Sequence, residues 1–388
     1  MYEVRQVRMD DGEVLYVLAP KDTGVQDTYV TRHMLVELRS RRLSSGTIRN
    51  KLIGIGYGLS FLREREIDIE ERISTGQYLS AEELMLIAER CASRHDGSGA
   101  TTPSYASANY HAFVDYFAFR TGEVLQFTDR RHHRSINAAL AEFRIRSKKA
   151  GPRPSAGAAA NERLGLHPDQ RRHFLDVIRP DSAENPFQSK LRVRNRAILL
   201  AAYALGIRSG ELLGLKRVDY DTRSNPAMLT IHRRPDDPDE TRAEPALAKT
   251  LSRTLPIEGA LRTAIDAWLK ARADRAMYPE ARKHPYLFTG TEGEALTARG
   301  LRHIYQRLRK VHPELEGIVH HILRHDANDR WVEQNEAQGL DPAAAREDQL
   351  YLMGWSPTSK QPENYAKAAI RRRAARRLTD VQRKLMES

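Results

Sequence analysis

The stretch RNRAILLAAYALGIRSGELLGLKRVDYD, residues 194–221, decides the fold of the second half of the chain. It predicts a buried helix, a turn at Leu205-Gly206, a short second helix and an acidic turn. Arg208 and Glu211 lie one turn apart directly after the apolar run. A charged pair that follows a buried helix is usually a structural ion pair, so these two residues alone do not indicate a site.

A second polar stretch, HHILRHDAN at residues 320–328, allows two interpretations. His321 and His325 are four apart, which places two imidazoles on one helix face, as in a metal site. His321 and Arg324 are three apart and also share a face, and a His–Arg pair suits an anion such as phosphate. Arg324 weighs against the metal, because a fixed cation one turn away repels a divalent ion.

The charge balance points to a polyanionic partner. The net charge is +12 and the isoelectric point is near 9.7, which favours nucleic acid, although a well-solvated basic surface would have the same composition. Cys91 is the only cysteine. An internal disulfide and a zinc site of several thiolates are therefore excluded, and a reducing cytoplasm is expected.

Membrane insertion is not expected. The N-terminal residues MYEVRQVRMDDGE lack the apolar core of a signal peptide. The most apolar run, residues 197–207, is too short to span a bilayer and indicates a buried helix. We expect a cytoplasmic protein that associates with the nucleoid when it binds DNA.

The N-terminal half is expected to be a helical domain preceded by a hairpin. Residues 1–26 predict a β-hairpin-like extension around Asp11-Gly12. Residues 27–149 predict an all-helical domain, with an apolar stripe, a capping box of Ser80 and Glu83, and a helix that stops near Thr121-Gly122. The stripe consists of Ile48, Leu52, Ile55, Leu59 and Leu62.

A basic segment leads into a linker at residues 150–162, which is rich in Gly, Pro, Ala and Ser. A solvated helix face would carry the same charge, but a basic stretch before a flexible linker suits a protein that wraps around a polyanion. We therefore expect contacts with DNA phosphates. The candidates are Arg130, Arg131, Arg134, Arg144, Arg146, Lys148 and Lys149.

Residues 163–388 predict a second domain that is mainly helical. MLTIH at 228–232 and RTLPI at 253–257 are strand-like and flank a long charged loop. Helices are expected near 258–274, 297–311 and 320–336 and at the basic C-terminus. The predicted fold class is mainly α: an all-helical N-terminal domain and an α-rich domain with a small antiparallel β-sheet.

Two further places in this domain carry polar chemistry. Lys249 precedes the second strand, and Trp355 and Tyr365 flank the turn in GWSPTSKQPENYAK. An arginine, a hairpin lysine, His-x-x-Arg, then His or Trp, then Tyr is the order found in the tyrosine recombinases, or phage integrase family. The chain resembles this family over nearly its whole length. The resemblance implies a core-binding domain that clamps DNA, followed by a catalytic domain.

The resemblance implies a role for each of these residues. Arg208 and Arg324 would neutralise the non-bridging phosphate oxygens, as a metal ion does elsewhere, so no metal or other cofactor is expected. The other roles are nucleophile for Tyr365, general acid for Lys249, phosphate binding and proton acceptance for His321, and phosphate binding for Trp355. The supporting residues are Glu211, which would orient Arg208 or the neighbouring histidine, and His325; His320 receives no role.

Three features depart from the family pattern. Trp355 stands where histidine is more usual, and Asp326 is expected to add a carboxylate near the phosphate site. The stretch between Arg324 and Trp355, and the loop before Lys249, are long, and we expect the extra residues in loops. Tyr351 is a rival nucleophile, but it precedes the Gly-Trp turn.

The expected function is site-specific recombination of duplex DNA through a 3′-phosphotyrosyl intermediate. The expected partners are a double-stranded inverted-repeat site, three further subunits that form a tetramer on DNA and exchange strands through a Holliday junction, and accessory proteins. The free protein is expected to be monomeric, and the basic helix with RRRAARR at 371–377 to contact a neighbouring subunit. The alternatives are a type IB topoisomerase-like relaxing enzyme and a non-cleaving regulatory relative.

Overall fold

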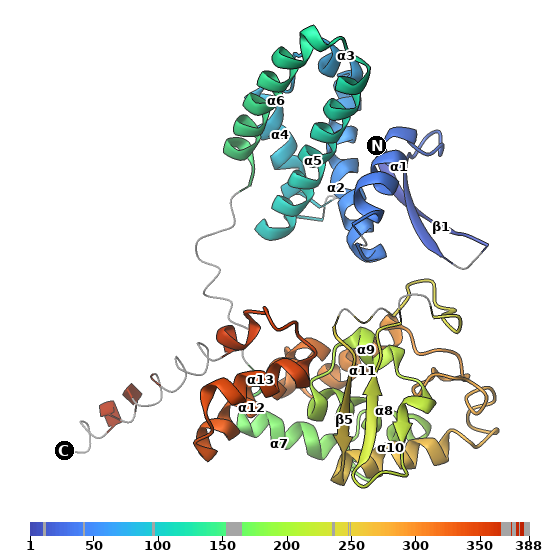
Figure 1. Cartoon of the computed structure of the whole chain (residues 1–388). Helices are drawn as coiled ribbons and strands as arrows, with labels where there is room; N and C mark the ends of the chain where they lie inside the picture. Colours follow the sequence, from blue (N-terminus) through green and yellow to red (C-terminus); the bar gives the residue numbers. More distant parts are fainter. Residues whose placement is uncertain are drawn as a thin grey trace. The chain divides into compact units, whose positions relative to one another are not determined.

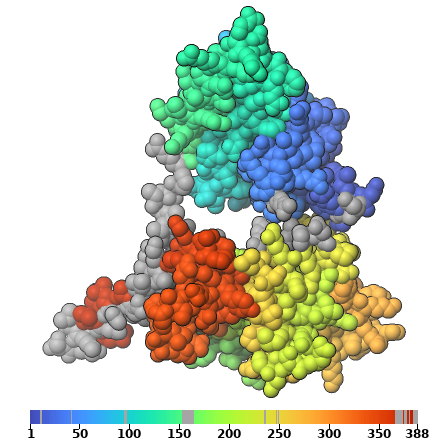
Figure 2. Space-filling model, viewed as in Figure 1, coloured from blue at the N-terminus to red at the C-terminus, as the bar shows by residue number. Residues whose placement is uncertain are grey.

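The computed structural model describes the chain except residues 11–12, 42, 95–97, 153–164, 235–236, 247, 249, 366–373, 375–377, 380 and 384–388. It divides into two compact units, Met1–Ala160 and Asn161–Ser388 (Figures 1 and 2). Lys249, the Asp11-Gly12 turn, most of the expected linker and most of the RRRAARR segment lie outside the described residues.

The first unit is a hairpin packed on helices. Its elements are β1 (Tyr2–Arg8), β2 (Val14–Pro20), α1 (Thr28–His33), the π-helical turn η1 (Met34–Arg39), α2 (Ser45–Glu64), α3 (Ile69–Ser74), α4 (Ala81–Ala92), α5 (Pro103–Phe127) and α6 (Arg130–Ala150). All five residues of the predicted α2 stripe are buried, and the capping box of Ser80 and Glu83 is confirmed. The hairpin belongs to this unit, because the Tyr2 N–H donates to Ser60 Oγ at 2.8 Å and Leu18 is buried in the same core.

The predicted end of α5 near Thr121-Gly122 is wrong, because the helix continues to Phe127. Buried polar contacts cross the expected break. Arg120 pairs with Glu123 across the break at 2.5 Å, and Glu123 also pairs with Arg32 of α1 at 2.7 Å. These tertiary and local bonds outweigh the cost of about 1 kcal/mol for a glycine inside a helix.

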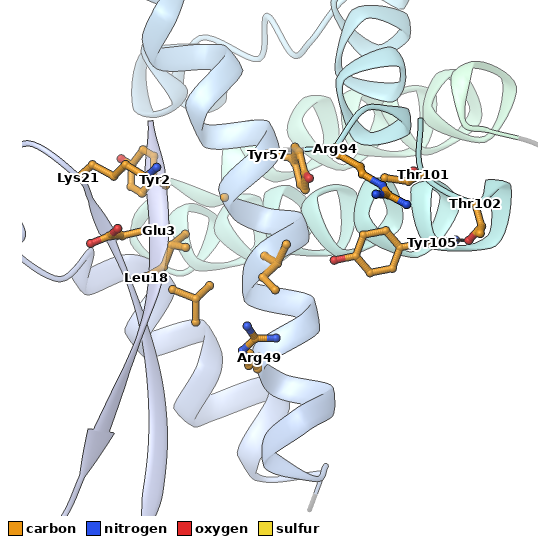
Figure 3. A pocket seen from close by; sticks show the side chains of 13 residues that line it. Tyr2, Glu3, Leu18, Lys21, Arg49, Tyr57, Arg94, Thr101, Thr102 and Tyr105 are labelled. Carbon is orange, nitrogen blue, oxygen red and sulfur yellow. Dashed lines mark hydrogen bonds between the residues drawn. The ribbon is translucent and has the colours of Figure 1, made fainter. Parts of the chain in front are cut away.

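A hollow of about 680 Å³ lies against the hairpin, α2 and the start of α5 (Figure 3). Its wall contains the basic side chains of Lys21, Arg49 and Arg94, and one acidic side chain, Glu3. The first unit is therefore positively charged at this place as well as along α6.

Close contact between α2 and α5 depends on two glycines of α2. A Cβ atom at Gly54 would meet the Asn109 carbonyl oxygen at 2.5 Å, and one at Gly58 would meet Phe113 Cδ2 at 2.1 Å. Gly54 and Gly58 are one turn apart and share a face. Only the missing side chains let the two helices approach this closely.

The second unit places a small sheet among helices. Its elements are α7 (Pro168–Val177), α8 (Ser189–Leu205), α9 (Ser209–Gly214), η3 (Arg217–Asp219), β3 (Tyr220–Asp221), β4 (Ala227–Ile231), β5 (Arg253–Ile257), α10 (Gly259–Ala271), α11 (Ala298–Val311), η4 (Pro313–Leu315), α12 (His320–Gln338) and α13 (Pro342–Met353). The strands form an antiparallel sheet in the order β3-β4-β5. Helix α8 packs against both α10 and α12. The predicted mainly α fold class is confirmed.

The expectation that the extra residues between Arg324 and Trp355 form loops is wrong. Helix α12 continues to Gln338, and α13 follows after a short turn, so that both form one continuous orange-red surface in Figure 2. Gly339 ends α12 with φ +64°, and the Asp341 carboxylate caps α13 by accepting two backbone N–H groups. Of the helices that the structure describes, none is long and apolar enough to span a bilayer.

Replacing Gly58 with alanine should destabilise the first unit by about 1–3 kcal/mol, because the methyl group overpacks the contact with Phe113. Urea unfolding followed by far-UV circular dichroism measures the change. Gly46→Ala is the matched control: a Cβ atom there meets nothing within 4 Å, so it should be neutral or stabilise α2 by up to about 1 kcal/mol. Equal loss in both variants would show that the close approach is not responsible.

Candidate active site

A buried ion pair fixes the start of α9. The side chains of Glu211 and Arg253 are both fully buried. Glu211 Oε1 lies 3.0 Å from Arg253 Nη1, and Glu211 Oε2 lies 3.1 Å from Arg253 Nη2. Glu211 also accepts the Arg208 backbone N–H at 2.7 Å and the Thr250 hydroxyl. Burial alone would raise the pKa of Glu211, but the pairing with Arg253 holds it below its usual value. The Glu211 carboxylate therefore fixes Arg208 by accepting the backbone N–H of Arg208.

Arg324 is held in the interior by two backbone carbonyls. Its Nη1 donates to the Gly206 oxygen at 2.6 Å and its Nη2 to the Met353 oxygen at 3.1 Å. Its Cζ lies 5.5 Å from the centre of the Trp355 ring. Burial, and then the nearby Arg208, lower the pKa of Arg324 to about 10. The guanidinium remains charged at neutral pH, and its position is set by the protein alone.

Two buried donors at this place have no hydrogen-bond partner among the described residues. They are Nη1 of Arg208 and Nε1 of Trp355. A buried donor without a partner costs free energy in the isolated protein, so it usually has a function that the protein alone does not show. Together with Arg324, these groups can receive an anion.

Tyr365 packs against the same cluster. Its ring stacks on Trp355 with centroids 5.8 Å apart and lies 5.4 Å from the ring of His325. His325 Nε2 is 2.9 Å from His321 Nε2, so one ring donates to the other. Burial raises the pKa of Tyr365, and the charges of Arg324 and Arg208 oppose this shift only in part. The phenol is therefore protonated at neutral pH.

The rival nucleophile, Tyr351, is engaged elsewhere. Its side chain is exposed, its hydroxyl donates to the Thr254 carbonyl at 3.1 Å, and the same oxygen accepts the Thr254 N–H at 3.3 Å. These bonds hold it on strand β5. The structure thus brings Arg208, Arg324, Trp355 and Tyr365 together, and leaves Tyr351 outside the cluster.

A model of the phage integrase family matches residues 166–367, which is more than half of the chain and includes every member of this cluster. The chain belongs to the phage integrase family. The resemblance expected from the order of the polar residues is confirmed.

Curated relatives in the family match only part of the chain. Tyrosine recombinase XerC of Shewanella amazonensis is 26% identical over 170 residues, which is 44% of this chain and 48% of that protein. XerC of Staphylococcus aureus is 25% identical over 166 residues, or 41% of this chain and 49% of that protein. The chain spans about half the length of the curated relatives it matches.

Solved structures of the family are similar over more of the chain at lower identity. A lambda integrase tetramer bound to a Holliday junction shares 14% identity, covering 87% of this chain and 76% of that chain, with a TM-score of 0.46. XerH recombinase bound to a palindromic difH substrate shares 17% identity, covering 89% and 92%, with a TM-score of 0.45.

His320, to which no role was given, fixes the backbone beside Arg208. Its Nε2 donates to the Ile207 carbonyl at 2.7 Å, so Nδ1 is the acceptor for the Tyr305 hydroxyl at 3.1 Å. Both bonds require a neutral ring, and burial lowers the pKa of His320 to about 4. Arg253, which pairs with Glu211, was also given no role from the sequence. Their partners lie on other elements, and no local sequence signal points to either contact.

The expectation for Asp326 is wrong. This buried carboxylate accepts Arg171 Nε at 2.6 Å, Arg330 Nε at 2.9 Å and the Leu166 N–H at 3.0 Å. It is two residues after Arg324, which turns it about 200° around α12 and away from the arginine cluster. Asp326 therefore ties the start of the second unit to α12.

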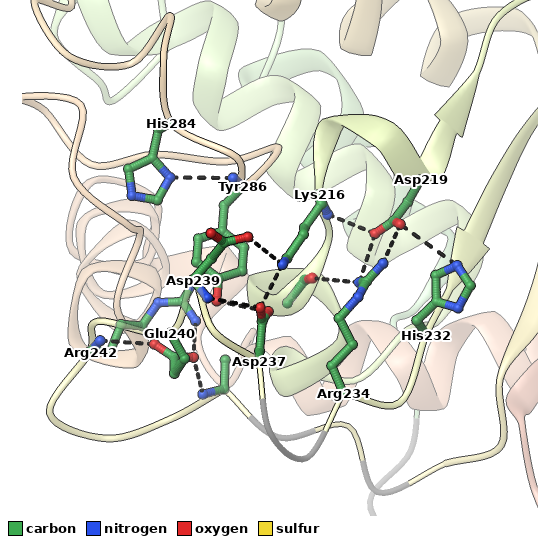
Figure 4. Close-up of polar contacts among 12 residues, drawn as sticks. Lys216, Asp219, His232, Arg234, Asp237, Asp239, Glu240, Arg242, His284 and Tyr286 are labelled. Atoms are coloured by element: carbon green, nitrogen blue, oxygen red, sulfur yellow. Dashed lines mark hydrogen bonds and ion pairs between the residues drawn. The ribbon is translucent and has the colours of Figure 1, made fainter. Parts of the chain in front are cut away.

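The charged loop before Lys249 is anchored at several points (Figure 4). Lys216 Nζ lies 2.5 Å from Asp237 and 2.6 Å from Asp239. Arg242 donates to the Leu213 carbonyl at 2.7 Å, and the Ala246 N–H donates to Glu240 at 3.0 Å. The described part of the loop from Asp237 to Ala246 is thus fixed to α9 and its surroundings.

We expect acid to weaken the second unit through His320. A depressed folded-state pKa means that its stabilising contribution is complete above the unfolded value near 6.5 and is lost as the pH falls towards 4. Between pH 7 and pH 5, wild type should lose roughly 2 kcal/mol more than His320→Gln, whose amide can make both bonds without titrating.

Tryptophan fluorescence during urea unfolding measures this difference, because Trp268, Trp331 and Trp355 all lie in the second unit. His33 of the first unit, whose pKa burial also lowers to about 4, does not affect that signal. Parallel pH profiles for wild type and His320→Gln would contradict the prediction.

Proposed function

We propose that the chain is a site-specific DNA recombinase, which cleaves one strand of duplex DNA through Tyr365 and rejoins it to another. The observation that carries the proposal is a pair of buried donors without a partner among the described residues, Arg208 Nη1 and Trp355 Nε1, beside Arg324 and Tyr365. These donors suit a phosphodiester, which presents two non-bridging oxygens. The family membership and the XerC relatives, which are named as tyrosine recombinases, support the same reaction.

The arginines stabilise the charge that develops during attack. Arg208 and Arg324 hold two guanidinium groups in place before DNA binds, and Trp355 adds an N–H that can donate but cannot titrate. Each such donor contributes about 3 kcal/mol to the transition state. This charge is supplied by side chains, so we propose cleavage without a metal ion or ATP.

Proton transfer accompanies the attack. The raised pKa of Tyr365 means that its proton must leave as the phosphorus–oxygen bond forms. His321 accepts this proton, and the hydrogen bond between the Nε2 atoms of His321 and His325 holds its ring in place. Lys249 protonates the leaving 5′-oxygen. The 3′-phosphotyrosyl bond conserves the energy needed for rejoining.

A stripe of cations on α6 supports the proposal of a DNA clamp. Positions 130 and 148 are separated by five full helical turns and point in the same direction. Positions 134 and 144 lie about 40° to either side of that direction, so all four share one face of the helix. All four side chains are exposed, and the one acidic residue of α6, Glu142, lies about 120° around the helix. The stripe consists of Arg130, Arg134, Arg144 and Lys148. Arg146 is partly buried and faces away from it.

Strand exchange requires more than one subunit. We propose that monomers bind an inverted-repeat site and assemble into a tetramer, which exchanges strands through a Holliday junction, with accessory proteins where the site demands them. Lambda integrase itself has been solved as a tetramer bound to a Holliday junction. The basic segment 371–377 would contact the neighbouring subunit.

A nicked suicide duplex from the DNA flanking the gene should become covalently attached to wild type and to Tyr351→Phe, but not to Tyr365→Phe. The reaction is run in EDTA and analysed on denaturing gels. Trp355→Phe should slow attachment by about 100-fold or more, because it removes one donor, and Trp355→His should recover part of the rate.

An adduct that persists in Tyr365→Phe would move the nucleophile elsewhere. Tight, sequence-selective binding without any adduct would instead identify a regulatory relative, and supercoil relaxation without sequence preference would identify a topoisomerase-like enzyme.

Loss of two charges from the α6 stripe should weaken DNA binding. Log affinity falls as log salt concentration rises, and the double variant Arg134→Gln/Arg144→Gln should make this negative slope shallower by about 2. Fluorescence anisotropy at several salt concentrations measures the slope. Arg131→Gln/Lys149→Gln is the matched control, since it removes the same charge from another side of α6 and Arg131 already pairs with Asp129 at 2.8 Å. Equal effects of both pairs would exclude a directed contact through the stripe.

A further inference from the structure

Two histidines and a glutamate meet at a corner of the second unit that the cleavage chemistry does not use. His173 is in α7, His312 follows the end of α11, and Glu314 is in η4. One ligand atom from each lies within 4.8 Å of the others. His173 Nε2 is 2.6 Å and His312 Nδ1 is 3.7 Å from the same oxygen, Glu314 Oε1. Ligand atoms from two segments, α7 and the α11–η4 corner, therefore converge here.

Neighbouring groups prepare these atoms for a cation. The ring of His312 donates through Nε2 to the Glu184 carbonyl at 3.0 Å, which leaves the Nδ1 lone pair directed at the cluster. Metal-binding histidines are commonly oriented by such a bond from the second ring nitrogen. The backbone of Glu314 is fixed by Gln170, whose amide donates to its carbonyl at 2.9 Å.

The spacing is close to that of a tetrahedral ion. Zinc bonds of about 2.0–2.2 Å at tetrahedral angles place ligand atoms roughly 3.3 Å apart. Two of the three separations, 2.6 and 3.7 Å, lie on either side of that distance, and the two histidine nitrogens lie within 4.8 Å of each other. The Glu314 side chain is about half exposed, so it can make the adjustment of under about 1 Å that these separations require, and water can complete the coordination.

We propose that His173, His312 and Glu314 form a binding site for a divalent transition-metal ion, with Zn²⁺ as the best match to two imidazoles and one carboxylate. The ion would join α7, the first described helix of the unit, to the α11–η4 corner against which it packs. Its role is structural. The inference does not depend on the proposed DNA cleavage, and the ion takes no part in that reaction.

A simple ion pair between His173 and Glu314 is the main alternative. It would require a protonated His173 and would bind no metal. His321 and His325 form a second pair of imidazoles in the same unit, 2.9 Å apart, and could take up the ion instead. A test must separate these three cases.

The test is calorimetric titration of the full-length, tag-free, EDTA-stripped protein with zinc chloride at pH 7.5, together with thermal unfolding followed by tryptophan fluorescence. We expect one ion per chain and a rise in Tm of several degrees at saturation. His173→Asn and Glu314→Gln should each weaken zinc binding by more than about tenfold and abolish the rise in Tm. His303→Asn, an exposed histidine on α11, is the matched control and should bind zinc like wild type.

Absence of stoichiometric zinc binding to wild type would overturn the proposal and leave the ion pair. Binding that is lost in His325→Asn but retained in His173→Asn would overturn it in favour of the second histidine pair. Both ligand variants replace partly exposed side chains, and their Tm values without zinc show whether they are folded. The cleavage assay is run in EDTA, so its result does not depend on zinc. A failed cleavage assay would contradict the role of Tyr365 and would leave the zinc site untouched.

Discussion

The ion pair between Glu211 and Arg253 connects three elements that are far apart in the sequence. Glu211 belongs to α9, Arg253 begins β5, and Arg253 also donates through Nε to the Leu352 carbonyl at 2.7 Å, near the end of α13. Removing one partner of such a buried pair typically costs about 3–5 kcal/mol, because the other charge is left unpaired. The backbone of Arg208 and the turn before Trp355 therefore depend on this one contact.

Around this pair, backbone carbonyls hold the side chains of the site in place. Arg324 is bound to the oxygens of Gly206 and Met353, and His320 to that of Ile207. Gly206 has φ +58°, and a Cβ atom there would meet Ala327 at 2.8 Å, so glycine is required both for the turn and for the approach of α12. Rigid placement before binding is what allows fixed dipoles and charges to stabilise a transition state.

The errors of prediction share a physical cause. Asp326 was assigned to the phosphate site because it is close to Arg324 in sequence, yet two residues along a helix point to opposite sides. The extra residues between Arg324 and Trp355 were expected in loops because the stretch is longer than usual for the family, although Gly339 and the Asp341-Pro342 pair mark a helix end and a helix start. Local spacing predicts which side chains share a face, but it does not predict what each face contacts.

By itself, the sequence determined the mainly α fold class, the apolar stripe of α2, the short helix at Arg208, and the order of polar residues that is typical of the family. These features are local, because they follow from helical periodicity, caps and motif order. The tertiary structure alone decided that Arg253 pairs with Glu211, that His320 holds Ile207, and that the Arg208 and Trp355 donors are left without partners among the described residues. The first two contacts join groups from separate elements, and the two donors come from the start of α9 and from the turn after α13, so all three features are set by packing and not by local sequence.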